Sequence, residues 1–130
     1  MTKSEAAVNV NTCPIVSAIR EIGGEWNFII IRYLIEKNMG FNELLRNATG
    51  ISSRTLSSVL KDLVSKDIVK REIISTQPFL VRYSLTEKGN SLKPIVDDLG
   101  KWGKLWVTGS IEATDPPAGS PVPDARTSGP

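Results

Sequence analysis

Residues 50–64, GISSRTLSSVLKDLV, constrain the fold of this chain more than any other stretch. Arranged as a helix, they place apolar side chains on one side and hydroxyls with positive charges on the other. The apolar side comprises Leu56, Val59, Leu60, Leu63 and Val64, and the polar side comprises Arg54, Ser57, Ser58, Lys61 and Ser65. The first side is suited to a core, and the second is available to contact another molecule.

The start of this helix is specified by its own residues. Ser52 is placed to accept a hydrogen bond from the amide of Arg54 or Thr55, which caps the first turn. Ile51 precedes the cap and is expected to pack on Leu56 one turn later. The sequence therefore predicts a helix over residues 52–66.

A shorter helix is predicted immediately before it. Gly40 interrupts the preceding helix, Asn42 is a candidate cap, and residues 43–46 form the short helix before a turn at residues 47–50. Two short helices joined by a glycine-containing turn, the second amphipathic and cationic, are typical of a helix-turn-helix. A plain helical hairpin is the alternative.

The next segment favours the helix-turn-helix. Residues 68–75 and 79–85 are rich in β-branched and aromatic side chains and flank the turn residues 76–78. A hairpin directly after a helix-turn-helix is typical of a winged helix, so we predict an α+β fold, mainly helical, with a two-stranded wing at residues 68–85. Arg82 and Lys70 are expected to supply charge beside the DNA backbone or minor groove.

The flanking segments predict three further helical regions. Pro14 suits the first turn of a helix that ends at Gly23-Gly24, and residues 26–37 are apolar nearly all round, as expected of a buried central helix. Thr86 is a candidate cap for a last helical region, which Pro94 divides or kinks.

The first and last of these regions carry apolar stripes that exceed what a small core needs. The stripe residues are Ile15, Ile19, Ile95, Leu99, Trp102 and Trp106, and Gly100 and Gly103 leave room for a neighbouring helix. We therefore expect a dimer interface there, with ordinary core packing as the alternative.

Composition sets the boundaries and excludes several chemistries. Residues 1–12 are predicted to be a flexible arm, 13–107 one domain, and 108–130 a disordered tail rich in Pro and Gly. The 130-residue chain has no histidine and a single cysteine, Cys13, so Ser-His or Cys-His catalysis and a Cys/His zinc site are excluded. No disulfide within the chain, secretion signal or membrane span is expected, which indicates a cytoplasmic protein without cofactor or metal.

Charge is concentrated in the middle of the chain. Residues 41–93 hold 9 Lys and Arg against 5 Asp and Glu, a balance of +4, whereas residues 1–40 hold 4 of each and residues 94–130 hold 3 against 5. The hydroxyl-rich helix lies in the basic segment, which favours a nucleic-acid partner.

Several motifs in order along residues 13–106 resemble HxlR-type transcriptional regulators, winged-helix proteins related in architecture to the MarR regulators. The matching motifs are Cys13-Pro14, Ile22-Gly23-Gly24 with Trp26, Phe41-Asn42-Glu43-Leu44, Gly50-Ile51-Ser52 with Leu56 and Leu60, Tyr83-Ser84-Leu85-Thr86-Glu87-Lys88-Gly89, and Trp102-Gly103. The resemblance implies a homodimer on operator DNA. Glu25 stands where this family usually has lysine, so a contact that this lysine makes with the DNA backbone is not assigned to Glu25.

The resemblance also singles out Cys13, because several members of this family sense oxidants or thiol-reactive compounds through a cysteine near the N-terminus. A thiolate at this helix start would face free amides and the helix dipole. The alternative is a small apolar residue at the dimer contact.

The sequence thus predicts a DNA-binding transcriptional regulator acting on an inverted repeat. The expected DNA-contacting residues are Ser52, Ser53, Arg54, Thr55, Ser57, Ser58, Lys61 and Arg82. A winged helix used for protein contact is the second hypothesis. An enzyme has the least support, because no nucleophile, metal cluster or phosphate loop is visible.

Overall fold

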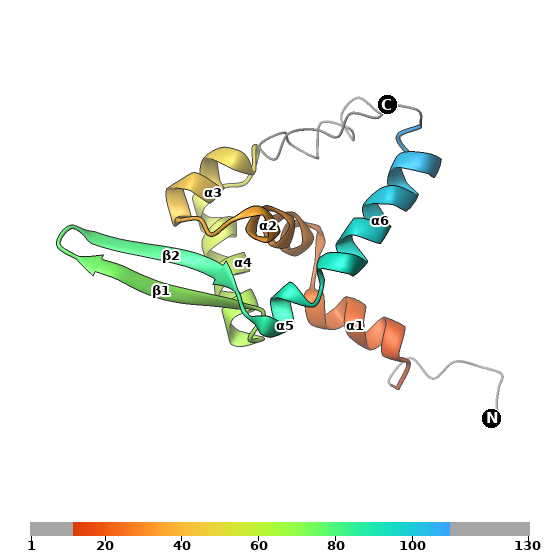
Figure 1. Ribbon diagram of the computed structural model, residues 1–130, viewed down its shortest axis with the longest axis horizontal. Coiled ribbons are helices and arrows are strands. Elements are labelled where there is room, and N and C mark those ends of the chain that lie inside the picture. Colours follow the sequence, from red (N-terminus) through yellow and green to blue (C-terminus); the bar gives the residue numbers. More distant parts are fainter. Residues whose placement is uncertain (1–11, 110–130) are drawn as a thin grey trace.

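The computed structural model describes residues 12–109. Its elements in chain order are α1 (Pro14–Ile22), α2 (Glu25–Glu36), α3 (Phe41–Asn47), α4 (Ser53–Ser65), β1 (Val69–Thr76), β2 (Phe79–Leu85), α5 (Glu87–Asn90) and α6 (Lys93–Trp106). Figure 1 shows α2 at the centre, the hairpin projecting from one side, and α1 and α6 on the opposite side. This is the predicted winged helix.

The core forms around α2, as its apolar composition predicts. Tyr33, Ile30 and Ile31 have no exposed surface, and they pack in one cluster with the buried side of α4. That side consists of Leu56, Val59, Leu60 and Leu63. Val64 was also expected there but is 38% exposed, because the core contact of α4 ends at Leu63 and the chain then turns towards the hairpin.

Local residues account for several of the helix starts. Ser52 Oγ accepts from the Thr55 amide at 3.0 Å, and Pro14 and Pro94 lie in the first turns of α1 and α6, as predicted. The prediction for Asn42 is wrong. The helix α3 begins two residues earlier than predicted, at Phe41, with Gly40 as its N-cap and no side-chain cap, which leaves Asn42 exposed within the first turn.

The antiparallel hairpin is buried only at its base. Val69 pairs with Leu85, and both side chains belong to the core, whereas the rest of β1 is almost entirely exposed. Met39 adds a short bridge to β2 through its backbone contacts with Tyr83. The hairpin is therefore held at its base and along β2.

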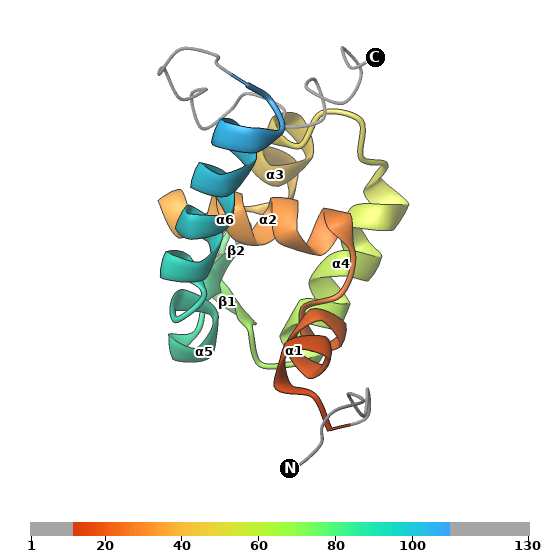
Figure 2. The same ribbon diagram turned by 90° about the vertical axis from the view of Figure 1, so that its right-hand side faces the viewer.

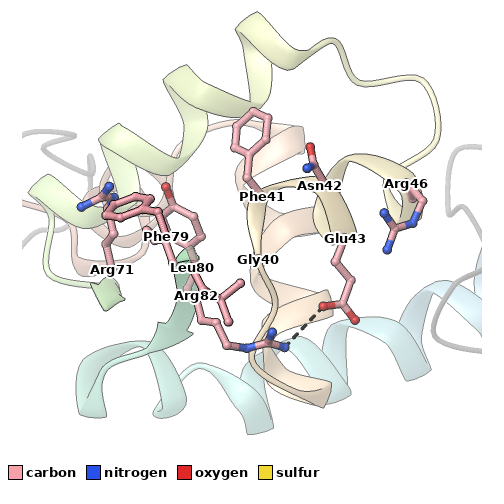
Figure 3. Close-up of a pocket in the computed structure, with 11 residues that line it drawn as sticks. Gly40, Phe41, Asn42, Glu43, Arg46, Arg71, Phe79, Leu80 and Arg82 are labelled. Atoms are coloured by element: carbon pink, nitrogen blue, oxygen red, sulfur yellow. Dashed lines mark hydrogen bonds and ion pairs between the residues drawn. The ribbon is translucent and has the colours of Figure 1, made fainter. Parts of the chain in front are cut away.

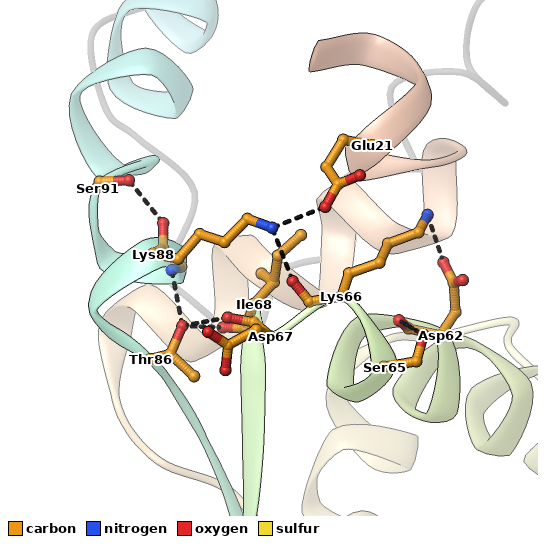
Figure 4. Close-up of polar contacts among 10 residues, drawn as sticks. Glu21, Asp62, Ser65, Lys66, Asp67, Ile68, Thr86, Lys88 and Ser91 are labelled. Atoms are coloured by element: carbon orange, nitrogen blue, oxygen red, sulfur yellow. Dashed lines mark hydrogen bonds and ion pairs between the residues drawn. The ribbon is translucent and has the colours of Figure 1, made fainter. Parts of the chain in front are cut away.

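Polar contacts attach α1 and α5 to the turn before the hairpin (Figure 4). The Lys88 ammonium donates to Glu21 Oε2 at 2.7 Å and to the Lys66 carbonyl at 2.8 Å. The hydrogen bond and charge of Lys88 lower the pKa of the Glu21 carboxyl. Thr86 Oγ1 donates to the Asp67 carbonyl at 2.6 Å and accepts from the Gly89 amide, which confirms it as a cap.

The predicted N-terminal arm and C-terminal tail fall almost wholly outside the described residues, which include only Thr12 of the arm and Thr108 and Gly109 of the tail. Within residues 12–109, no helix has the length and apolar character needed to cross a membrane.

Candidate nucleic-acid interface

The polar face of α4 is exposed, as the sequence predicts. We define this face as Ser53, Arg54, Ser57, Ser58 and Lys61; Ser57 is half-buried and the others are exposed. Ser65, which the sequence also placed on the polar side, is exposed, but its hydroxyl donates to the Asp62 carbonyl at 2.7 Å. Within residues 12–109, neither Arg54 nor Lys61 has an ion-pair partner. Two cations and three hydroxyls are thus available on one helix surface to donate hydrogen bonds to an anionic partner.

The hydroxyls at the start of α4 are already engaged in the cap. Ser52 Oγ donates to Thr55 Oγ1 at 3.0 Å while it accepts from the Thr55 amide. Ser52 and Thr55 therefore fix the first turn, and Arg54 projects from a rigid helix start.

A buried amide holds α4 against α2, and sequence reasoning missed it. Asn27 is 7% exposed and donates through Nδ2 to the Ile22 carbonyl at 2.8 Å and to Asp62 Oδ2 at 2.9 Å. Gly23, with φ of 102°, lies against this amide, and a Cβ there would overlap it. The Gly-Gly turn and Asn27 together set the position of α4.

Arg82 lies in the middle of β2, and its charge is used within the domain. One guanidinium nitrogen donates to the Asn38 carbonyl at 2.9 Å and lies 3.4 Å from Glu43 Oε1 (Figure 3). Lys37 approaches the other carboxylate oxygen at 2.9 Å, and mainly this contact, with a contribution from Arg82, lowers the pKa of Glu43. Arg82 therefore links the hairpin to α3.

A hollow of about 480 Å³ lies between α3 and the hairpin. Arg71 and Phe79 both line the hollow, and Figure 3 shows Arg71 at one side of it and Arg46 at the other. Both arginines are exposed and have no ion-pair partner within the described residues. Sequence reasoning did not select them, although both lie in the basic segment at residues 41–93, which also contains α4.

The helix α6 contributes no buried residue to the core. Its predicted stripe is exposed: Ile95 is 54%, Leu99 53%, Trp102 59% and Trp106 69% exposed. Leu105, which was not part of the predicted stripe, is 68% exposed. On α1, Ile15 is 71% and Ile19 56% exposed. Core packing within one chain, the alternative from the sequence, is therefore wrong for these side chains. The two helices lie on the side away from the hairpin, facing the viewer in Figure 2.

Cys13 is the N-cap of α1. Its thiol is free and half-buried, and the first exposed stripe residue, Ile15, follows two positions later.

The profile of the HxlR-like helix-turn-helix matches residues 21–110, more than half of the chain. The chain belongs to the HxlR family. An uncharacterized HTH-type transcriptional regulator of Methanothermobacter thermautotrophicus is 37% identical over 94 residues, covering 72% of each protein. The regulator YybR of Bacillus subtilis is 38% identical over 96 residues, covering 74% of this chain and 77% of YybR. This HxlR-family chain thus carries the helix-turn-helix domain of transcriptional regulators.

Solved structures agree with this assignment. A MarR-family regulator from Porphyromonas gingivalis W83 superposes with a TM-score of 0.72 at 29% identity, covering 78% of this HxlR-family chain and all of the other. The redox regulator HypR in its reduced form gives a TM-score of 0.67 at 37% identity, covering 71% of this chain and 91% of the HypR chain. Reduced YodB from B. subtilis gives a TM-score of 0.67 at 31% identity, covering 77% of this chain and 99% of the YodB chain.

Proposed function

We propose that this HxlR-family protein is a cytoplasmic homodimer that binds an inverted-repeat operator and regulates transcription. The carrying observation is the polar face of α4, where Arg54 and Lys61 are exposed without ion-pair partners in the described part of the chain. The helix at residues 52–66 enters the major groove, and the wing at residues 68–85 lies along the backbone or minor groove.

Each side chain has a distinct role in this proposal. Arg54 and Lys61 donate to guanine acceptors or phosphates, Ser57 and Ser58 adapt to base edges, and Ser53 donates to a phosphate near the helix start. Ser52 and Thr55 act through the cap geometry, because their hydroxyls are bonded to each other. Arg82 positions the wing through Glu43, and Arg46 and Arg71 are additional candidates for phosphate contacts.

Dimerisation uses the exposed stripes of α1 and α6. Burying Ile15, Ile19, Ile95, Leu99, Trp102 and Trp106 against a second copy removes this apolar surface from water, which favours association. A two-fold arrangement presents the two copies of α4 in opposite orientations about 34 Å apart, one turn of DNA, so an inverted repeat is the expected operator.

Arg54→Ala is expected to relax base preference at one position in each half-site. The loss follows from removing a bidentate donor, which is worth about 1–3 kcal/mol of discrimination between bases. The measurement is selection of duplexes from a random pool, followed by fluorescence anisotropy on the enriched sequence. Lys101→Ala, an exposed cation on α6, is the control and should leave the preference unchanged.

Failure to enrich any sequence with the wild-type protein at low salt would overturn specific DNA recognition. A protein-binding winged helix would then be the better assignment.

Redox sensing by Cys13 is part of the proposal. It is supported by the similarity to HypR, whose structures are of a reduced and an oxidized form, and by the place of the thiol at the start of α1 beside the proposed dimer face. Diamide is expected to oxidise two Cys13 thiols from different chains to one disulfide, with reduction of the diazene to a hydrazine.

The product should be a covalent dimer on a non-reducing gel, with an operator affinity different from that of the reduced protein. Cys13→Ser is the control and should show neither change. An unchanged affinity in the disulfide-linked protein would contradict the sensing role.

A further inference from the structure

The tip of the hairpin is apolar and uncharged. Residues 73–81, IISTQPFLV, contain no Asp, Glu, Lys or Arg. Four apolar side chains stand open there: Ile73 is 53%, Ile74 52%, Phe79 62% and Leu80 43% exposed. A cluster of this kind at the end of a projecting hairpin promotes aggregation unless a partner covers it.

A β-bulge sets the direction of these side chains. The register passes from Ile73 opposite Val81 to Ser75 opposite Leu80, so Ile74 is the extra residue. A bulge bends the strand, increases its twist and re-aims side chains beyond it. In this hairpin it leaves two consecutive isoleucines exposed, with Phe79 opposite Thr76 at the tip.

The charged residues of the hairpin are confined to its lower half. Lys70 lies 3.9 Å from Glu72, Arg82 is engaged by Glu43 and Asn38, and Arg71 borders the hollow beside α3. None of these cations is within the tip, so the tip cannot neutralise a phosphate. Its chemistry is that of an apolar surface.

The base of the hairpin has a fixed position relative to α4. Only residues 66–68 separate α4 from β1, Val69 is anchored in the core, and Arg82 ties β2 to α3. The eight residues of β1, at about 3.3 Å each, carry the tip roughly 26 Å from this anchor. Figure 1 shows the hairpin projecting beyond α4. If α4 occupies a major groove, a reach of this length is enough to pass the phosphate backbone to the neighbouring minor groove.

From these observations, and resting on the proposed DNA-binding function, we infer that the wing tip is an apolar wedge for the DNA minor groove. Phe79 enters the groove, packs against the deoxyribose walls and partly unstacks one base step, while Ile74 and Leu80 cover the adjoining sugars. Proteins that insert apolar side chains at the minor groove kink the duplex in this way. The tip of the wing thus adds affinity without adding a phosphate contact.

The test uses the full chain and the duplex enriched by selection, with 2-aminopurine placed in turn at steps flanking each half-site. Wild-type protein is expected to brighten the probe at one step, which reports unstacking. Phe79→Ser should weaken binding by about tenfold to thirtyfold, since one aromatic contact with a base is worth on that order, and should abolish the fluorescence change.

The dependence of affinity on salt separates a wedge from an ionic contact. Phe79→Ser should leave the slope of log affinity against log salt unchanged, because no phosphate contact is lost. Phe79→Lys should steepen the slope by about one unit without restoring the fluorescence. Thr76→Ala, the polar residue opposite Phe79, is the matched control and should behave like wild type.

Full affinity of Phe79→Ser with no fluorescence change at any step in the wild type would overturn the wedge while leaving the proposed regulator intact. A loss of affinity with a shallower salt slope would overturn it in favour of a phosphate contact. Absence of sequence enrichment by the wild type would instead overturn both proposals, and the tip would then be assigned to a protein partner.

Discussion

Trp102→Asp is expected to convert the proposed dimer to a monomer and to weaken operator binding by about 100-fold or more. Trp102 lies near the middle of the exposed stripe of α6, and central tryptophans are frequent hot spots of interfaces. A carboxylate there must be buried without a partner or keep the two chains apart. A monomer contacts only one half-site, so it also loses the gain in affinity that comes from linking two binding modules.

The measurements are molar mass by light scattering and fluorescence anisotropy on the enriched duplex. Lys101→Asp places the same carboxylate on the adjacent exposed residue and is the control, expected to remain dimeric. Circular dichroism checks that the variant is folded. We expect it to be folded, because no side chain of α6 is fully buried in the core of its own chain. A dimeric Trp102→Asp protein would show that α6 is not the interface.

Gly89→Ala is expected to destabilise the fold by about 2–3 kcal/mol, a typical cost of overpacking a site that cannot relax. A Cβ at Gly89 would overlap the carbonyl oxygen of Ile68 and crowd the Leu85 side chain. The obstructing carbonyl is backbone, which the Thr86 amide also engages at 3.0 Å, so it cannot swing aside. Helix propensity alone predicts the opposite sign, because alanine favours helix over glycine.

Urea unfolding at equal protein concentration measures the effect, as a lower midpoint with an unchanged slope. The control is Gly24→Ala, at an exposed helix cap with no atom within 4 Å of the new Cβ. That variant should lose about 1 kcal/mol or less. Equal midpoints for Gly89→Ala and wild type would mean that the backbone adapts where Ile68 and Gly89 meet.

The features that sequence reasoning predicted correctly share a local cause. Ser52 and Thr86 cap helices through hydrogen bonds to amides three residues away, and Pro14 fits a first turn whose amides have no helical partner. The two β-rich runs on either side of residues 76–78 likewise predict the hairpin from neighbouring residues. Interactions of this range are encoded within a few positions and can be identified in one sequence.

The contacts that sequence reasoning missed involve residues far apart in the chain, whereas the wrong cap at Asn42 is a local error. Arg82 bonds to Asn38 and Glu43, and Asn27 joins Ile22 to Asp62, contacts that span up to 44 positions. The sequence identifies Arg82 as a cation, but only the packed hairpin shows that a carboxylate of α3 engages it. Asn27 is a similar case. It lies within a mostly apolar run of the sequence, and nothing in that run indicates that its amide bonds to Ile22 and Asp62.

By itself, the sequence determined the order of helices and strands, the apolar side of α4 and the family, because these depend on periodicity, caps and short motifs. Tertiary structure alone decided which cations remain available to a partner, that α6 keeps its tryptophans outside the core, and that the wing projects an uncharged tip. Availability of a side chain depends on what packs beside it, and packing brings together residues that the sequence separates by tens of positions.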